Sequence, residues 1–210
     1  MRLMAHGKIN LSLDITAKRE DGYHDISSVM QSVQLCDEVE ITSNTSGKIN
    51  VETDSADLPN GEHNIAHKAC AKMIEQYQLD CGFDIYIKKR IPLAGGMAGG
   101  STDAATVLHG VNQLCELNLS QETLMNIGKQ IGADVPFCVQ KNPAHATGIG
   151  EILTSVTGLP EDTSIVLVNP GIQVSTKLIY EAIDASATYG TGQNDLLISA
   201  QQNYHVLSAV

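Results

Sequence analysis

The stretch of sequence that decides the fold reads PLAGGMAGGSTDAA and occupies residues 92–105. An alternating apolar pattern over residues 83–87 predicts a strand before it, and a helical pattern predicts a helix after it, with Ser101 as the N-cap. Glycine lets backbone N–H groups approach phosphate oxygens because no Cβ intervenes, and a helix N-terminus adds partial positive charge. This order of strand, loop and helix favours a phosphate-binding site over a flexible loop that merely ends in a helix cap.

The spacing of the glycines excludes several common nucleotide-binding motifs. No lysine follows Gly100, so the loop is not a Walker A motif, and the G-x-G-x-x-G spacing of a dinucleotide site is missing. The chain also lacks the H-R-D and D-F-G segments of a protein kinase. Ser101 and Thr102 provide hydroxyl groups that could contact phosphate or a metal ion.

Short strands and helices alternate along the rest of the chain, which argues for an α+β fold. Apolar residues at positions 9, 11, 13 and 15 alternate with polar ones, so Lys8 and Asn10 share the polar face of a half-buried strand. Asp21-Gly22 predicts a turn, and the pattern after Ala187 predicts no element. Further strands are expected at residues 29–35, 39–42, 48–53 and 165–168, and helices at residues 64–78, after Ser120, and from Ser175 or Thr176.

Composition limits the class of protein and its partners. The 210 residues, 42% hydrophobic and 18% charged, are typical of a globular protein with one large domain or a domain and a half. The formal net charge of −11 disfavours nucleic acid as a partner, and no apolar run is long enough to cross a membrane. Five cysteines without a C-x-x-C pair favour buried thiols in the reducing cytoplasm, and no protein-built metal site is expected.

Several separated segments give the chain a resemblance to a known family. The loop at residues 92–105 resembles the phosphate loop of the GHMP kinases, which use ATP to phosphorylate small molecules. Residues 7–13 (GKINLSL), 18–24 (KREDGYH) and 132–137 (GADVPF) resemble the branch of this family that acts on a cytidine-linked sugar alcohol in isoprenoid precursor synthesis. Residues 169–180 match more weakly. The loop and these motifs, in this order, make the resemblance specific.

The resemblance implies the GHMP kinase fold. Residues 1–150 would form an N-terminal, ATP-binding domain like the second domain of a ribosomal small-subunit protein. Residues 151–210 would begin a ferredoxin-like C-terminal domain. Three features depart from the family: His6-Gly7 replaces the usual Pro-Ala, residues 140–145 differ from the usual Gly-rich turn, and a late G-S-G segment is missing. We therefore expect the natural protein to continue beyond Val210, or else an enzyme of this length to be a poor catalyst.

The resemblance assigns Lys8 and Asp134 to catalysis. Asp134 would accept the proton of the substrate hydroxyl as it attacks the γ-phosphoryl group of ATP. Lys8 would keep that carboxylate ionised and stabilise charge on the transferring group. Each residue also has an ordinary alternative, because an aspartate ahead of Val135 often caps a helix and a strand lysine is usually solvated.

Ligand-binding residues follow from the same resemblance. Asn10, Tyr23 and His24 would hold the cytidine diphosphate end, with Tyr180 as a second aromatic face over the base and Thr176 as a polar contact. Tyr180 fits a helix core about equally well. ATP, accompanied by Mg²⁺, would contact Asn64 near the adenine, where the alternative is a helix N-cap. The loop residues assigned to ATP are Pro92, Leu93, Ala94, Gly95, Gly96, Met97, Ala98, Gly99, Gly100, Ser101 and Thr102.

Two other functions stay open at this point. One is another GHMP kinase that acts on homoserine or a mevalonate-type substrate, and the D-G-Y-H segment at residues 21–24 argues against it. The other is a catalytically silent nucleotide-binding relative, which only the missing G-S-G segment supports and which Lys8 and Asp134 oppose. In each case the expected partners are small molecules, and the sequence does not determine the oligomeric state.

Overall fold

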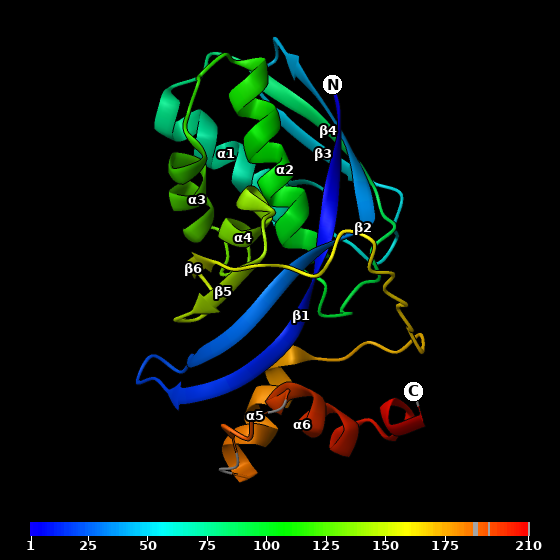
Figure 1. Ribbon diagram of the computed structural model, residues 1–210. Helices are drawn as coiled ribbons and strands as arrows, with labels where there is room; N and C mark the ends of the chain where they lie inside the picture. Colours follow the sequence, from blue (N-terminus) through cyan, green and yellow to red (C-terminus); the bar gives the residue numbers. More distant parts are fainter. Residues whose placement is uncertain (187–188, 193, 210) are drawn as a thin grey trace. The chain divides into compact units, whose positions relative to one another are not determined.

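The computed structural model describes residues 1–186, 189–192 and 194–209, and the chain forms two compact units (Figure 1). The first unit contains residues 1–8, 32–91 and 98–141. The second contains residues 9–31, 92–97 and the described residues from 142 onward. Each unit is therefore built from separate stretches of chain. The two units do not divide the chain at a single position, since residues 9–31 group with the C-terminal part. The domain boundary expected at residue 150 therefore stays a prediction.

The elements follow one another along the chain as a mixture of strands and helices. They are β1 (Arg2–Lys18), β2 (His24–Asn44), β3 (Ile49–Thr53), the 3-10 helix η1 (Gly61–His63), α1 (Ile65–Tyr77), β4 (Gly82–Lys88), α2 (Gly99–Leu114), α3 (Gln121–Lys129), α4 (Val135–Gln140), β5 (Ala144–Thr147), β6 (Ile152–Ser155), α5 (Thr176–Ser186), α6 (Asp195–Asn203) and the 3-10 helix η2 (His205–Ala209). The hydrogen-bonded strand order is β3-β4-β2-β5-β6, and β1 pairs with β2. None of the described helices has the length and apolar character needed to cross a membrane.

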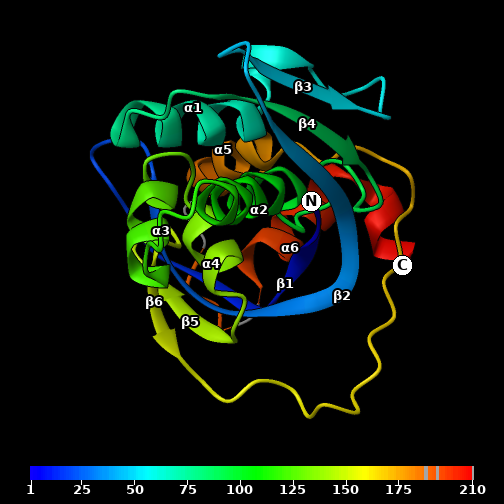
Figure 2. The same ribbon diagram turned by 90° about the horizontal axis from the view of Figure 1, so that it is seen from above.

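In the first unit, helices pack against paired strands (Figure 2). β2 pairs antiparallel with β4, with Val39 opposite Ile87, and β3 pairs parallel with β4. α1 and α2 lie side by side on one face of these strands. Gly110 of α2 permits close packing there, because a Cβ at this position would lie 2.9 Å from Cγ2 of Ile41 on β2. The core consists of small and apolar side chains, among them Ala66, Ala69, Cys70, Met73, Phe83, Ile85, Ile87, Ala104, Leu108 and Val111.

In the second unit, an aspartate ties a hairpin strand to the C-terminal helices. The predicted turn at Asp21-Gly22 joins β1 to β2, and Gly22 takes the φ of +86° that glycine tolerates. β2 pairs antiparallel with β5, and β5 pairs antiparallel with β6. Asp195, the first residue of α6, accepts hydrogen bonds from the backbone N–H groups of Ile15 (2.8 Å) and Gly190 (2.8 Å). α5 and α6 pack against each other.

Elements with strong local signals lie where the sequence predicted them. The expected helices at residues 64–78, after Ser120 and from Ser175 are confirmed as α1, α3 and α5, and the strand at residues 83–87 is confirmed as β4. Ser120 caps α3 by accepting a hydrogen bond from the N–H of Thr123 (3.2 Å). Ser175 accepts one from the N–H of Leu178 (3.4 Å) at the start of α5.

The strands predicted at residues 29–35 and 39–42 are confirmed, but the break predicted between them is wrong, and so is the strand predicted at residues 165–168. The segments at residues 29–35 and 39–42 belong to a single strand, β2, which continues through Asp37, where the prediction broke the chain. Residues 165–168, all described, lie outside any strand, and Val166 is 85% exposed. A strand needs a neighbour to satisfy its backbone hydrogen bonds, and none of the described strands pairs with this segment.

Alternation along β1 predicts burial only in part. Leu13 and Ile15 are buried as expected, but Leu11 is 43% exposed and Lys8, on the predicted polar face, is buried. The strand passes from the first unit to the second between Lys8 and Ile9, so the environment of its faces changes along its length.

The C-terminal part contains a helix that the sequence pattern did not predict. Ala187, after which the sequence pattern predicts no helix or strand, lies outside the described residues, as does Val210. Between them α6 forms, with Asn194 as its N-cap: the Asn194 Oδ1 accepts a hydrogen bond from the N–H of Leu197 (3.1 Å). The capping asparagine was the signal that could have revealed this helix.

Candidate active site

The phosphate loop enters α2 without a side-chain cap. α2 begins at Gly99, so Ser101 lies in the first turn and is not the N-cap that the sequence predicted. Ala98 takes the capping position with a left-handed backbone (φ +55°), and within the described chain no side chain caps this helix end. Uncapped N–H groups at a helix N-terminus carry partial positive charge and bind anions. The corrected helix start therefore keeps the anion-binding character expected of the loop.

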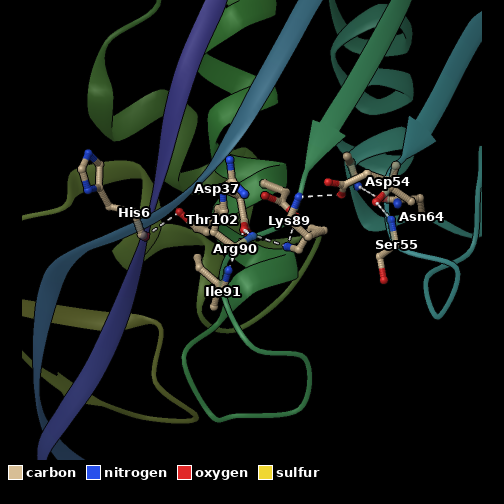
Figure 3. Close-up of polar contacts among 12 residues, drawn as sticks. His6, Asp37, Asp54, Ser55, Asn64, Lys89, Arg90, Ile91 and Thr102 are labelled. Atoms are coloured by element: carbon tan, nitrogen blue, oxygen red, sulfur yellow. Dashed lines mark hydrogen bonds and ion pairs between the residues drawn. The ribbon is translucent and has the colours of Figure 1, made fainter. Parts of the chain in front are cut away.

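The two hydroxyl residues of the loop have different environments. Thr102 is fully buried, and its Oγ1 donates a hydrogen bond to the carbonyl oxygen of His6 (2.8 Å; Figure 3). This bond ties α2 to β1 two residues before Lys8. Ser101 is half-buried. Because the Thr102 hydroxyl is engaged within the protein, Ser101 is the better candidate for a contact with phosphate.

Lys8 and Asp134 both act electrostatically on the same buried thiol. Lys8 on β1 is only 6% exposed, and Asp134 immediately precedes α4. Burial raises the pKa of the Cys138 thiol on α4, the Asp134 carboxylate raises it further, and the Lys8 ammonium lowers it. Both charges therefore lie within electrostatic range of Cys138. The structure brings together the two residues to which the resemblance assigned catalysis.

The ordinary alternatives for these two residues fit only in part. Asp134 occupies the N-cap position of α4, ahead of Pro136, but among the described residues its side chain makes no capping hydrogen bond. Its carboxylate is therefore not used to cap the helix. Lys8 is buried, so it is not a lysine that points into solvent from an exposed strand face.

A buried ion-pair cluster, which the sequence did not reveal, lies where the loop begins; Figure 3 labels two of its members, Lys89 and Asp37. Nζ of Lys89 is 2.5 Å from Oδ2 of Asp37 and 2.7 Å from Oδ2 of Asp103. The side chains of all three residues are more than nine-tenths buried. We call Lys89, Asp37 and Asp103 the buried triad. The available sequence signal was Asp37, an acidic residue between the strands predicted at residues 29–35 and 39–42.

The buried triad contains one more carboxyl group than it has ammonium groups. Burial raises the pKa of Asp103 to about 7, against the pull of Lys89, and the Asp37 carboxylate adds to the rise. Oδ1 of Asp103 is buried and has no hydrogen-bond partner in the described part of the chain. Burial lowers the pKa of Lys89, but the two carboxylates more than offset this and raise it. Lys89 therefore stays protonated, and Asp103 is the group that titrates near neutral pH.

A second charged cluster lies in the second unit, near the protein surface. Oδ1 of Asp184 on α5 is 2.8 Å from Nε2 of His24, and its Oδ2 is 2.7 Å from Nζ of Lys18. Hydrogen bonds from Lys18 and His24 lower the pKa of Asp184. We call Lys18, His24 and Asp184 the surface cluster. The His24 ring stacks on Tyr180, with ring centroids 4.8 Å apart and planes 21° apart.

The remaining residues assigned to the cytidine end belong to the same unit. Tyr23, adjacent to His24 in the chain, is 60% exposed. Nδ2 of Asn10 donates a hydrogen bond to Oγ of Ser28 (2.7 Å). Thr176 is the exposed first residue of α5. Asp184, which connects His24 to Lys18, is a residue that sequence reasoning missed, because 160 positions separate it from His24.

Asn64 takes the structural role that its alternative interpretation predicted. It is the N-cap of α1: its Oδ1 accepts a hydrogen bond from the N–H of Ala66 (2.9 Å), and its Nδ2 donates one to the carbonyl oxygen of Pro59 (3.0 Å). The capping interpretation is confirmed, and a role beside the adenine stays a prediction.

The cysteines do not have the properties of nucleophiles. All five are free thiols. Burial raises the pKa of Cys36 and of Cys138, that of Cys70 to about 12 and that of Cys115 to about 11. A nucleophilic cysteine requires a lowered pKa, so these four thiols are poorly suited to covalent chemistry.

Comparison with known proteins agrees with the fold and with the family that the motifs indicate. Residues 64–142 match the family model of the GHMP kinases N-terminal domain. The chain is 48% identical to a 4-diphosphocytidyl-2-C-methyl-D-erythritol kinase from Acetivibrio thermocellus. The aligned region covers 94% of this chain and 69% of that relative. The chain is 45% identical, also over 94% of its length, to 67% of the kinase of that name from Clostridioides difficile. The chain thus spans about two thirds of the length of these relatives, and it belongs to the GHMP kinase family.

Within this family the chain belongs to the 4-diphosphocytidyl-2-C-methyl-D-erythritol kinases. A crystal structure of 4-(cytidine 5'-diphospho)-2C-methyl-D-erythritol kinase matches all of this chain and 80% of its own, with a TM-score of 0.76 and 27% identity. Methanococcus jannaschii mevalonate kinase matches with a TM-score of 0.61, 12% identity and coverage of 100% of this chain and 78% of its own, which shows a shared fold alone. The predicted family, α+β GHMP kinase fold and kinase class are confirmed.

Proposed function

We propose that this chain transfers the γ-phosphoryl group of ATP to the 2-hydroxyl of 4-diphosphocytidyl-2-C-methyl-D-erythritol, a step of the methylerythritol phosphate route to isoprenoid precursors. The observation that carries the proposal is the 48% identity, over 94% of the chain, to a kinase of that name. The presence of Lys8 and Asp134 within electrostatic range of the same thiol, Cys138, supports it, because a carboxylate and an ammonium are what this transfer requires.

In the proposed reaction the substrate oxygen attacks the γ-phosphorus, the bond to the ADP oxygen breaks, and the hydroxyl proton passes to the Asp134 carboxylate. Lys8 stabilises the negative charge that spreads over the transferring group. The N–H groups at the start of α2 and the loop at residues 92–102 hold the phosphates. Asn64 is the residue proposed to lie beside the adenine.

Magnesium is proposed as the companion of ATP. Mg²⁺ keeps several water ligands and needs only one or two protein oxygens beside those of the phosphates. The described residues include no group of three or more His, Cys, Asp or Glu side chains that could hold a metal ion. The protein oxygen proposed to lie beside it is the Ser101 hydroxyl, because the Asp134 carboxylate is the proposed base. Bound there, the ion would neutralise phosphate charge.

The cytidine end of the substrate is proposed to bind around the surface cluster. The exposed Tyr23 ring and the His24–Tyr180 stack offer aromatic faces to a pyrimidine, and Asn10 and Thr176 offer polar contacts. The proposed partners are small molecules alone, and the proposed compartment is the cytoplasm, where free thiols persist.

An ADP-release assay with the cytidine substrate tests the proposal directly. Wild-type protein should turn over only when ATP and the cytidine substrate are both present. Asp134→Asn should lose roughly two to four orders of magnitude in turnover, because an amide cannot accept the proton, while ATP-analogue binding stays nearly intact. Lys8→Met should lower kcat more than it weakens ATP binding. Wild-type turnover in the Asp134 variant would remove the assigned base.

A thermal-shift panel separates the alternatives. CDP, CMP, mevalonate and homoserine are added with and without a non-hydrolysable ATP analogue. A ligand that binds the folded state raises the melting temperature of the protein. Selective stabilisation by CDP supports the cytidine substrate. Stabilisation by mevalonate or homoserine instead points to another GHMP kinase. Nucleotide binding without turnover identifies a catalytically silent relative.

A further inference from the structure

We propose that the buried triad positions the phosphate loop by fixing both of its ends. Asp37 and Lys89 hold the strand from which the loop leaves, and Asp103 holds the helix into which the loop runs. The three residues would thus be positioning residues for ATP, and this inference rests on the proposed ATP site.

On the strand side, carboxylates accept the backbone hydrogen bonds of the residues that follow the end of the sheet (Figure 3). β4 ends at Lys88, and the next three backbone N–H groups donate to carboxylate oxygens. The N–H of Lys89 donates to Oδ1 of Asp54 (2.8 Å), and those of Arg90 (2.5 Å) and Ile91 (2.8 Å) donate to Oδ1 of Asp37. Hydrogen bonds to charged acceptors are stronger than neutral ones, so they fix the chain up to the residue before Pro92.

On the helix side, the ammonium of Lys89 lies under the first turn of α2. Nζ of Lys89 is 2.7 Å from Oδ2 of Asp103, and a Cβ built on Gly99 would lie 3.3 Å from this Nζ and 3.3 Å from Cγ2 of Ile91. The residues on the two sides of the loop, Ile91 and Gly99, therefore pack closely together with Lys89. Glycine at position 99 leaves room for the lysine head group.

Positioning of the loop explains this arrangement of charges better than a role in stability or in direct phosphate binding does. Apolar residues of similar volume often match or exceed a buried ion pair in stability, so a core here would not need charges. Lys89 faces two carboxyl groups, and its positive charge is therefore already compensated. A phosphate would gain little from it, whereas a loop with both ends fixed keeps its N–H groups aimed at one point.

Asp103→Ala tests the proposal, with Asp103→Asn as the conservative variant. Alanine removes the link to Lys89 together with the excess negative charge, and asparagine keeps an acceptor oxygen for the Lys89 ammonium. Val111→Ala, which creates a cavity at a buried position of the same helix, controls for lost stability. Each protein is titrated with a non-hydrolysable ATP analogue and, separately, with CDP.

We expect Asp103→Ala to weaken analogue binding by about 10- to 100-fold, because a small misplacement of a binding loop has effects of this size. Asp103→Asn and Val111→Ala should stay within about threefold of wild type, and CDP affinity should be unchanged throughout. If Asp103→Ala does not fold, Asp103→Leu, which leaves the Lys89–Asp37 ion pair intact and fills more of the lost volume, takes its place. Analogue affinity that is unchanged in the variant overturns this inference alone. A wild-type protein that binds no analogue overturns the proposed function, and the inference with it.

Discussion

The buried triad and the surface cluster use the same kinds of side chain to opposite electrostatic effect. In the buried triad, burial raises the pKa of Asp103 to about 7 even though Lys89 is 2.7 Å away. In the surface cluster, Lys18 is also 2.7 Å from its aspartate, yet hydrogen bonds lower the pKa of Asp184. The lysine partner is the same at the same distance, so solvent access and the neighbouring carboxylate decide the protonation state.

This difference predicts how each region responds to change. Side chains in the buried triad have no water to replace a lost partner, so the loss of Asp37 or Lys89 leaves buried donors or charges unsatisfied. Asp184 and Lys18 are partly exposed, and water can solvate whichever charge is left. The buried triad should therefore govern stability and its pH dependence, and the surface cluster should govern ligand binding.

The largest effect is expected from matched aspartate substitutions in the two regions. Asp37→Asn should destabilise the protein by about 3–5 kcal/mol, because the amide would point N–H groups at the Lys89 ammonium. Asp184→Asn should change stability little. Denaturant unfolding of both variants measures the difference. Equal losses would mean that burial does not distinguish the two regions.

The pH dependence of stability should carry the next largest effect. The native pKa of Asp103 is about 7, against an ordinary value of 3.8. Between about pH 4 and pH 7 the native state therefore holds a proton that the unfolded state has lost, and stability falls as pH rises. The loss of stability that this group causes is at most roughly 4 kcal/mol, and it reaches its full size above about pH 7. Asp184 acts in the opposite sense, because its pKa is lowered in the native state. It stabilises the folded protein at pH values above the ordinary pKa of an aspartate, and this stabilisation is lost as the pH falls through the lowered pKa.

Asp103→Asn isolates this effect, because asparagine mimics the protonated acid at every pH. Lys89, Asp37 and the Cys138 thiol face Asp103 from the neighbouring elements and are unchanged in the variant. Unfolding by denaturant is compared at about pH 5 and about pH 8. Asp103→Asn should match wild type at the lower pH and exceed it in stability at the higher. A variant that loses stability with pH as steeply as wild type would show that another group titrates.

A smaller effect is expected when the aromatic faces beside the surface cluster are removed. Tyr180→Ala and Tyr23→Ala should each weaken CDP binding by about 1–3 kcal/mol, as stacking of a base on an aromatic ring does elsewhere. Affinity for the ATP analogue should not change. Titration calorimetry with both ligands decides the matter, and unchanged CDP affinity in both variants would remove the proposed cytidine site.

The smallest effect is expected for Lys18→Met, which removes the exposed half of the surface cluster. Its stability should stay close to that of wild type, because exposed ion pairs contribute little and are screened by salt. Melting temperatures of wild type and variant, compared at low and high ionic strength, should converge at high salt. A loss of melting temperature that persists at high salt would show that this lysine contributes to stability as a buried charge does.

The sequence predicted the parts of the site that depend on short stretches of chain. The phosphate loop, the helix that follows it and the Ser120 cap all rest on neighbouring residues, so local patterns were sufficient. The start of α2 was placed too late, because Ser101 is a good capping residue while Ala98 carries no capping side chain. The motifs at residues 7–13, 18–24 and 132–137 also identified the family.

Only the tertiary structure decided which of these residues meet. Lys89 reads as one of several charged residues after a strand, yet it is buried against Asp37, which lies 52 positions earlier. Lys8 was placed on a polar strand face and is buried near Cys138. The physical reason is that propensity and periodicity act over a few residues, whereas burial and charge pairing depend on segments that fold together from distant parts of the chain. The sequence by itself determined the loop, its helix and the family. The fold determined which charges are buried beside them.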